Sequence, residues 1–355
     1  MPHLLAADAR FPAHYHAQED VAREFLSAAA GRGDATAERV ARFFHSVGVR
    51  GRHMVLPIES YPRLDGFGER SDLWLEHALE LGSGAVAGAL ARAGLTTADI
   101  SLFGFSTVTG VAVPSLEARI IGRLGGFRAD CRRLPLFGLG CVAGAAGLAR
   151  VCDFLRAYPR EAAIMLCVEL CSLTFQLADM SVANVIASAL FGDGAACVVL
   201  VGDEHPLANE SSPAVVDTRS VLFEGTERTM GWDIVDTGFR IVLSGSVPDL
   251  ARGPFSTAVE AFLASHDLAP RDVAHWIGHP GGPAVIDAIE QGLCLGRGAL
   301  DASRRGLAQV GNLSSASVLT LLRDVLHGDR PSAGQPGMLF AMGPGFCAEL
   351  VLLQW

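Results

Sequence analysis

The sequence contains no lysine, so all 28 of its basic residues are arginines, and 38 acidic residues give a formal net charge of −10. Without lysine the chain cannot form a Schiff base, and it cannot supply the lysine of a phosphate-binding loop. It also lacks a basic run interleaved with aromatic residues, and its net negative charge repels phosphate backbones. These absences argue against nucleic-acid binding and imine chemistry.

Other signals are missing as well. No CxxC pair occurs among the eight cysteines, so neither a zinc site nor a disulfide framework is predicted. No apolar run approaches the roughly 18 residues of a membrane helix. The first twenty residues carry charges and prolines, unlike a signal peptide. No glycine fingerprint for a dinucleotide is present. We therefore expect a cytoplasmic protein with no metal and no redox cofactor.

What is present is apolar sequence: half of the 355 residues are hydrophobic. This length suits two sub-domains or one large α/β unit. Apolar β-rich runs alternate with helical patterns, which is typical of an α/β fold. A polar, proline-containing break near 205–213 divides the chain, and we predict an N-terminal half over 1–208 and a C-terminal half over 209–355.

The predicted elements fall in both halves. Strands are expected over 100–110, 161–172, 194–202, 215–225, 273–282 and 337–355. Helices are expected over 71–95, from just after Cys141 to about residue 159, over 283–293 and over 314–326.

One cysteine stands apart from the others. Cys141 lies in "LFGLGCVAGAAG" (136–147), between a glycine turn and a helix of small residues. A thiol at a helix N-terminus has a lowered pKa, which favours the thiolate. A buried packing cysteine beside a closely packed helix is the alternative.

Three motifs in the second half are further candidates. His279 follows an apolar strand in "WIGHPGG", where α/β folds display active groups, although a structural histidine fits equally. Asn312 opens a helix in "GNLSSAS" and is also a natural N-cap. The segment "AMGPGF" (341–346) is by itself a turn between two strands.

Taken in order, "GCVAG", "LFGDGAA" (190–196), "WIGHPGGPAVID" (276–287), "GNLSSAS" and "GPG" (343–345) resemble the type III polyketide synthases, the chalcone-synthase-like family. Each motif is weak alone, whereas five in family order are specific. The resemblance implies a thiolase-like αβαβα layered fold with two pseudo-duplicated halves. It also implies an acyltransferase that performs decarboxylative Claisen condensations on acyl-CoA and malonyl-CoA as a homodimer, without a cofactor.

The resemblance also implies roles for residues. Cys141 corresponds to the nucleophile that accepts the starter acyl group, with His279 as its imidazolium partner, and His279 and Asn312 to the groups that act on the thioester carbonyl. Further positions implied to line the cavity are Phe191 as gatekeeper, Phe239 as a second aromatic wall, Cys171, Thr174, Ser314, Gly343 and Gly345. Val113 matches the residue that enters the partner's cavity across the dimer interface. For the coenzyme A phosphates only Arg50 sits where a lysine is expected, with Arg52 as a second candidate.

The segment 226–248 is similar to bacterial members that take fatty acyl starters, so the predicted products are alkylpyrones or alkylresorcinols. A malonyl-CoA-primed aromatic synthase, a β-ketoacyl synthase and a non-catalytic scaffold of the same fold are the alternatives. The stretch "HPGGP" after the histidine disfavours the β-ketoacyl synthase, and the complete triad disfavours the scaffold. Whether Met230 or Gly231 lines the cavity is left open, as are starter length, the number of extensions and the mode of cyclisation.

Overall fold

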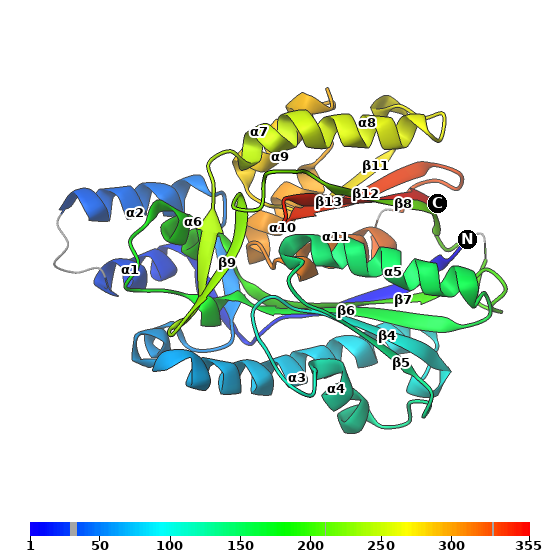
Figure 1. The fold of residues 1–355 in the computed structure, drawn as a ribbon, viewed down its shortest axis with the longest axis horizontal. Helices are drawn as coiled ribbons and strands as arrows, with labels where there is room; N and C mark the ends of the chain where they lie inside the picture. Colours follow the sequence, from blue (N-terminus) through cyan, green and yellow to red (C-terminus); the bar gives the residue numbers. More distant parts are fainter. Residues whose placement is uncertain (29–33, 210, 329) are drawn as a thin grey trace.

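The chain folds into five alternating layers of helix and sheet (Figure 1). A computed structural model describes residues 1–28, 34–209, 211–328 and 330–355. One outer layer contains α3 (Gly66–Ala93) and α4 (Leu116–Leu124). The central layer contains α5 (Ala143–Ala157) and α11 (Ser315–His327). The other outer layer contains α7 (Val247–Leu250), α8 (Ser256–Ala264) and α9 (Pro283–Gly292). The predicted αβαβα fold is confirmed.

The strands of the two halves repeat one pattern. In the first half the spatial order is β1 (His3–Arg10), β7 (Asp193–Val201), β6 (Ala162–Leu170), β4 (Ile100–Ser106) and β5 (Arg132–Leu136). In the second it is β8 (Ala214–Leu222), β13 (Cys347–Gln354), β12 (Pro336–Gly343) and β11 (His275–Gly278). In this spatial order, the first two pairs of neighbouring strands in each half are antiparallel and the third pair is parallel. The halves meet where His3 pairs with Ala214.

The central strands explain why the sequence reads as apolar runs. Every residue of β6 and of β7 is buried, because helices cover both faces of the sheet. All the predicted strands are present, whereas β1 was not among those predicted from the sequence. The run "AADA" within it hides the strand signal, because alanine and aspartate are depleted in strands.

Smaller elements gather at one end of the layers (Figure 1). They are α1 (Gln18–Ala28), α2 (Asp34–Ser46), β2 (His14–Ala17), β3 (Gly51–Met54), α6 (Val182–Leu190), β9 (Met230–Val235), β10 (Gly238–Leu243) and α10 (Asp301–Val310). In the described parts of the chain, none of the helices is long and apolar enough to cross a bilayer.

The two central helices approach each other closely because α5 begins with small residues. A Cβ placed on Gly144 would lie 2.3 Å from the carbonyl oxygen of Ser315 and 2.7 Å from Cγ1 of Val318. The small residues after Cys141 therefore let α5 lie against the start of α11. This contact joins the first half of the chain to the second.

We expect Gly144→Ala to destabilise the protein, because its new methyl group overlaps a backbone oxygen that cannot move without shifting α11. Overpacking of this kind costs about 1–3 kcal/mol. Gly122→Ala is the matched control, since it lies in the exposed helix α4 with no atom near its added Cβ. Urea unfolding of the two variants should show a loss for Gly144→Ala and no loss for Gly122→Ala. Equal stability of both would contradict the close approach.

Candidate active site

Cys141 lies in a turn of 3-10 helix, Gly140–Val142, between β5 and α5. The residue is only 7% exposed, and its thiol donates to Oγ of Ser314 at 3.6 Å. Gly140 has a φ of +55°, and a Cβ there would lie 2.7 Å from the ring of Pro344. The glycine before the cysteine is thus required by both backbone conformation and space.

His279 follows β11 and is held by its backbone, whose N–H donates to the carbonyl of Phe340 at 3.0 Å. The side chain is 6% exposed. Both imidazole nitrogens are buried and without a hydrogen-bond partner in the described structure. Buried polar atoms usually have partners, so these two nitrogens are available to a bound substrate.

Asn312 lies between α10 and α11. Its Oδ1 accepts the backbone N–H of Ser314 at 2.8 Å, which places the amide oxygen in the turn before the helix. The Nδ2 group is then the part of the side chain left to donate to a ligand. The N-cap of α11 is Ser314. The capping interpretation therefore accounts for only one end of the asparagine side chain.

Contacts between loops bring the five sequence motifs together. Gly140 packs on Pro344, and Cys141 contacts Ser314. Leu190 accepts the backbone N–H of Asn312 at 2.8 Å, and its side chain lies against Gly282 of the "HPGG" segment. Residues separated by up to about two hundred positions in the sequence thus form one buried cluster.

Burial controls the charge state of this cluster. It raises the pKa of the Cys141 thiol to about 12 and lowers the pKa of the His279 imidazole to about 3. Both shifts favour the neutral forms, because a charge in an apolar enclosure loses its hydration. The thiolate and imidazolium expected from the sequence stay predictions, and the burial of each side chain opposes its charged form. A neutral imidazole remains a competent acceptor for the thiol proton.

An aromatic wall lies next to the cluster. Phe239 is 3% exposed, and its ring centroid lies 5.3 Å from that of Phe67 and 6.1 Å from that of Trp232. The rings of Phe239 and Trp232 border a cavity of about 260 Å³. The residues that line the cavity include Val108, Gly138, Met230, Gly231, Trp232, Phe239 and Pro344. Met230 and Gly231 both line this cavity, as does Trp232, which the sequence analysis did not name.

Cys171 and Thr174 lie in the turn that follows β6. The Thr174 hydroxyl donates to the Cys171 carbonyl at 2.7 Å. Burial raises the pKa of the Cys171 thiol well above its usual range, and the nearby Glu169 carboxylate adds to this shift. Such a thiol stays protonated, which disfavours Cys171 as a second nucleophile.

Phe191 and Gly343 lie at the cluster, since Phe191 pairs with Asn312, whereas Val113 and Arg50 lie away from it. Phe191 is the half-buried C-cap of α6. A Cβ on Gly343 would lie 2.7 Å from the carbonyl oxygen of Leu139, so β12 can approach the cysteine turn only with glycine there. Val113 is 90% exposed. Arg50 is exposed and lines a separate groove of about 800 Å³ between α1 and α2.

Gly345 and Arg52 are the remaining positions singled out from the sequence. Gly345 adjoins Pro344 with a φ of +137°, which favours glycine. Arg52 is 0% exposed, so it cannot reach coenzyme A phosphates in solvent. Among the described residues, no group of three or more His, Cys, Asp and Glu side chains could hold a metal ion.

Glu169 was missed by the sequence analysis. Its carboxylate is fully buried in β6 and accepts the backbone N–H of Val108 at 3.1 Å and the hydroxyls of Thr109 and Ser315. Burial raises its pKa. A single acidic residue inside the apolar run "AAIMLCVEL" was the available signal.

Comparison with known proteins places this arrangement in a family. Residues 2–204 match the description "Chalcone and stilbene synthases, N-terminal domain", and residues 215–355 match "Chalcone and stilbene synthases, C-terminal domain". The chain is 49% identical to 1,3,6,8-tetrahydroxynaphthalene synthase of Streptomyces peucetius subsp. caesius over 352 residues, 99% of this chain and 93% of the relative. It is 33% identical to a putative chalcone synthase of Bacillus subtilis (strain 168), over 100% of this chain and 99% of that one.

Solved structures agree. The crystal structure of 1,3,6,8-tetrahydroxynaphthalene synthase from Streptomyces coelicolor A3(2) superposes with a TM-score of 0.93 at 30% identity, covering 99% of each chain. PKS-I of the brown alga Ectocarpus siliculosus gives 0.92 at 27% identity, covering 99% of this chain and 98% of that one. Sequence, fold and the convergence of the five motifs agree, and the chain belongs to the chalcone and stilbene synthase family of type III polyketide synthases, acyltransferases that build their products by decarboxylative condensation.

Proposed function

We propose that Cys141, His279 and Asn312 form the catalytic triad and that malonyl-CoA supplies both starter and extender units. The triad proposal rests on the observation that these three residues are buried in one cluster, where His279 and Asn312 keep unused hydrogen-bonding groups. His279 offers two unpartnered nitrogens, and Asn312 offers an amide donor beside the Cys141 turn.

Loading begins when the sulfur of Cys141 attacks the thioester carbonyl of an acyl-CoA. His279 takes the thiol proton as the new C–S bond forms, and passes it to the sulfur of coenzyme A as that thiol leaves. Ser314 accepts from the thiol at 3.6 Å and keeps Sγ in place before the attack. The family uses coenzyme A thioesters without a further cofactor.

Extension requires an enolate. Malonyl-CoA loses carbon dioxide, and negative charge develops on its thioester oxygen. His279 and Asn312 donate hydrogen bonds to that oxygen, in surroundings where no water competes. The enolate carbon then attacks the acyl-Cys141 thioester, a C–C bond forms, and the Cys141 sulfur leaves, free for the next cycle.

Two observations support malonyl-CoA as the starter: the small volume of the cavity and the product for which a relative is named. The cavity of about 260 Å³ beside Gly138 and Pro344 is lined on one side by the aromatic rings of Phe239 and Trp232. It lies below the usual range for small-ligand pockets, about 300–1,000 Å³. The relative that is 49% identical is named for a tetrahydroxynaphthalene, whose ring bears hydroxyl groups and no alkyl chain. Malonate units alone deliver such a skeleton.

A fatty acyl starter with an alkylpyrone or alkylresorcinol product is the second candidate. The flexible side chain of Met230 favours it, since this side chain lines the cavity and can move aside for a longer chain. The bulk of Trp232, immediately next in β9, opposes it.

For coenzyme A we propose the exposed Arg50, which lines the groove between α1 and α2 together with Arg23 and His45. These three side chains are the cationic or ionisable donors suited to phosphate there.

The proposed reaction uses coenzyme A thioesters as substrates, so we propose the cytoplasm as its compartment.

We also propose a homodimer in which Val113 enters the partner's cavity. Three apolar side chains at one edge of the fold, Val111, Val113 and Phe137, are 49%, 90% and 54% exposed. They neighbour β5, the terminal strand of the sheet, whose free edge can pair with a second copy. We further propose that 1–208 and 209–355 are the two halves, since the chain passes from the strands of the first half to those of the second between Val201 and Ala214.

The starter proposal predicts that purified protein with malonyl-CoA alone yields an aromatic product, detected by mass spectrometry. Acyl-CoA starters from acetyl to stearoyl should leave that mass unchanged. We expect Trp232→Ala to accept longer starters, because it removes one side of the aromatic wall. Product masses that rise with starter length in the unaltered protein would favour the fatty acyl candidate instead.

The triad predicts a separation of two activities. His279→Ala and Asn312→Ala should each slow malonyl-CoA decarboxylation by about 10²–10³, since each removes an oxyanion donor. Cys141→Ala should abolish acyl-enzyme formation, measured by intact-protein mass, yet keep decarboxylation. Cys294→Ala, which removes an exposed thiol, is the control for labelling. Normal acylation of Cys141→Ala would show that the nucleophile lies elsewhere.

The dimer proposal predicts that Val113→Trp changes the distribution of product lengths, because the larger ring enters the partner's cavity. Leu207→Trp, at another exposed apolar residue, is the control. Chromatographic profiles of the products should differ for Val113→Trp only. A protein that sediments as a monomer, or an unchanged profile, would contradict the proposal.

A further inference from the structure

Arg52 is a buried cation with no solvent contact and an unusual set of partners. Its Nη1 donates to the carbonyl oxygens of Ser188 at 2.8 Å and of Phe191 at 2.6 Å. Its Nη2 donates to the carbonyl of Ala189 and to Oε1 of Gln18. Burying a guanidinium is expensive, so its partners indicate what it stabilises.

Three of these four acceptors belong to the last turn of α6 and its C-cap Phe191. The last carbonyls of a helix have no partner within the helix, and a cation near them also interacts favourably with the helix dipole. Gln18 adds to this, since its Nε2 donates to Ala189 at 3.0 Å and to Phe44 at 3.0 Å. The end of α6 is therefore fixed by two side chains from outside the central layers.

The fixed segment is bonded directly to Asn312. The backbone N–H of Asn312 donates to Leu190 at 2.8 Å, and the N–H of Gly192 donates to the carbonyl of Asn312 at 3.0 Å. Gly311 has a φ of +76°, and a Cβ on it would lie 2.7 Å from the Leu190 carbonyl oxygen. With this little space, the position of Asn312 follows that of residues 190–192.

The charge of Arg52 is balanced within the same region. Asp193 follows Gly192 and accepts the backbone N–H of Val55 at 2.9 Å and that of Ser172 at 2.8 Å. Burial lowers the pKa of Arg52 to about 10, and Asp193 offsets part of that shift. Arg52 therefore keeps its charge at neutral pH and acts as a multiple donor to the α6 carbonyls.

We propose that Arg52 is a positioning residue that holds the end of α6 so that Asn312 presents its amide to the substrate and Phe191 stays beside Asn312, with which its backbone pairs. The proposal rests on the function proposed above. It differs from a general role in folding because it predicts a selective effect: chemistry that needs Asn312 should suffer, and chemistry that needs only Cys141 and His279 should not.

The test compares two readouts in Arg52→Met, which keeps much of the side-chain volume and removes every donor. Displacing a catalytic group by about 1 Å costs about a hundredfold in rate. We therefore expect malonyl-CoA decarboxylation to fall by about tenfold to a hundredfold. Alkylation of Cys141 by iodoacetamide, followed by peptide mass spectrometry, should stay near the unaltered rate. Arg52→Lys, which keeps a charged donor, should recover part of the decarboxylation.

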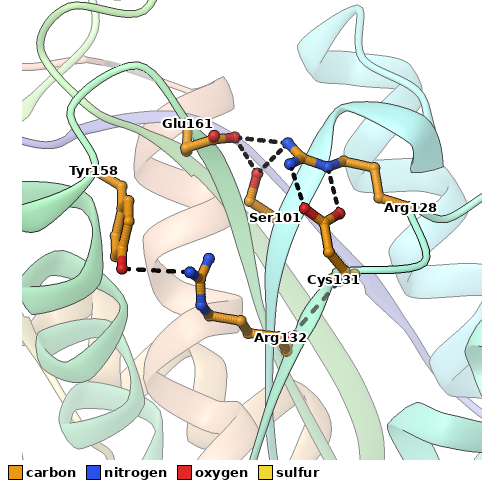
Figure 2. Close-up of polar contacts among 7 residues, drawn as sticks. Ser101, Arg128, Cys131, Arg132, Tyr158 and Glu161 are labelled. Atoms are coloured by element: carbon orange, nitrogen blue, oxygen red, sulfur yellow. Dashed lines mark hydrogen bonds and ion pairs between the residues drawn. The ribbon is translucent and has the colours of Figure 1, made fainter.

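Arg128→Met is the matched control. Arg128 also makes several hydrogen bonds, to Asp130, Glu161 and Ser101 (Figure 2). These lie at the start of β4 and β6, the opposite end of the strands from the Cys141 turn, which follows β5. Decarboxylation by Arg128→Met should match that of the unaltered protein.

Normal decarboxylation by Arg52→Met would overturn the positioning role, as would equal losses of decarboxylation and alkylation. If Arg52→Met does not fold, Arg52→Lys carries the same test, with reduced decarboxylation and normal alkylation expected. Absence of decarboxylation by the unaltered protein would overturn the proposed function itself, and with it this role. The two failures are thus distinguishable.

Discussion

The close packing of α5 against α11 is the contact on which the rest of this structure depends. Cys141 lies two residues before the start of α5, and Asn312 and Ser314 precede α11. Because Gly144 leaves room for the backbone of Ser315, the starts of the two helices lie together, and the residues before them meet in one cluster. A larger side chain at the contact would separate a nucleophile given by the first half from donors given by the second.

The cluster is polar inside an apolar enclosure, and its polar groups are held by specific partners. Glu169 accepts from Val108, Thr109 and Ser315, so one carboxylate ties β6 to the loop after β4 and to the start of α11. Arg52 holds the end of α6 by donating hydrogen bonds to its last carbonyl groups. Buried polar groups are costly unless they are satisfied, and when satisfied they permit few alternative arrangements. Such rigidity suits a site whose donors must meet a developing charge.

The same enclosure decides the chemistry. Burial raises the pKa of Cys141 and lowers that of His279, so it favours the neutral form of each side chain. A neutral imidazole can take a proton from the thiol and return it to a leaving group. Apolar walls such as Phe239 also favour the loss of a neutral molecule and keep water from reactive intermediates. Acyl transfer and decarboxylation therefore take place in the same buried, apolar enclosure.

The sequence by itself determined the buried central strands, several helices and the five motifs, because glycine turns, apolar runs and N-terminal helix signals are local, and the layered fold followed from the resemblance that those motifs carry. It gave no signal for β1, and the elements at the end of the layers, such as β9 and β10, were not predicted as helices or strands. It could not determine the pKa values at Cys141 and His279, since burial depends on segments far away in the chain. It placed Arg52 among candidates for coenzyme A, whereas only the tertiary structure shows that the guanidinium is enclosed by the end of α6. The contribution of Trp232 to the cavity was likewise decided by packing, since the position of a ring relative to a thiol is a long-range distance that no local pattern records.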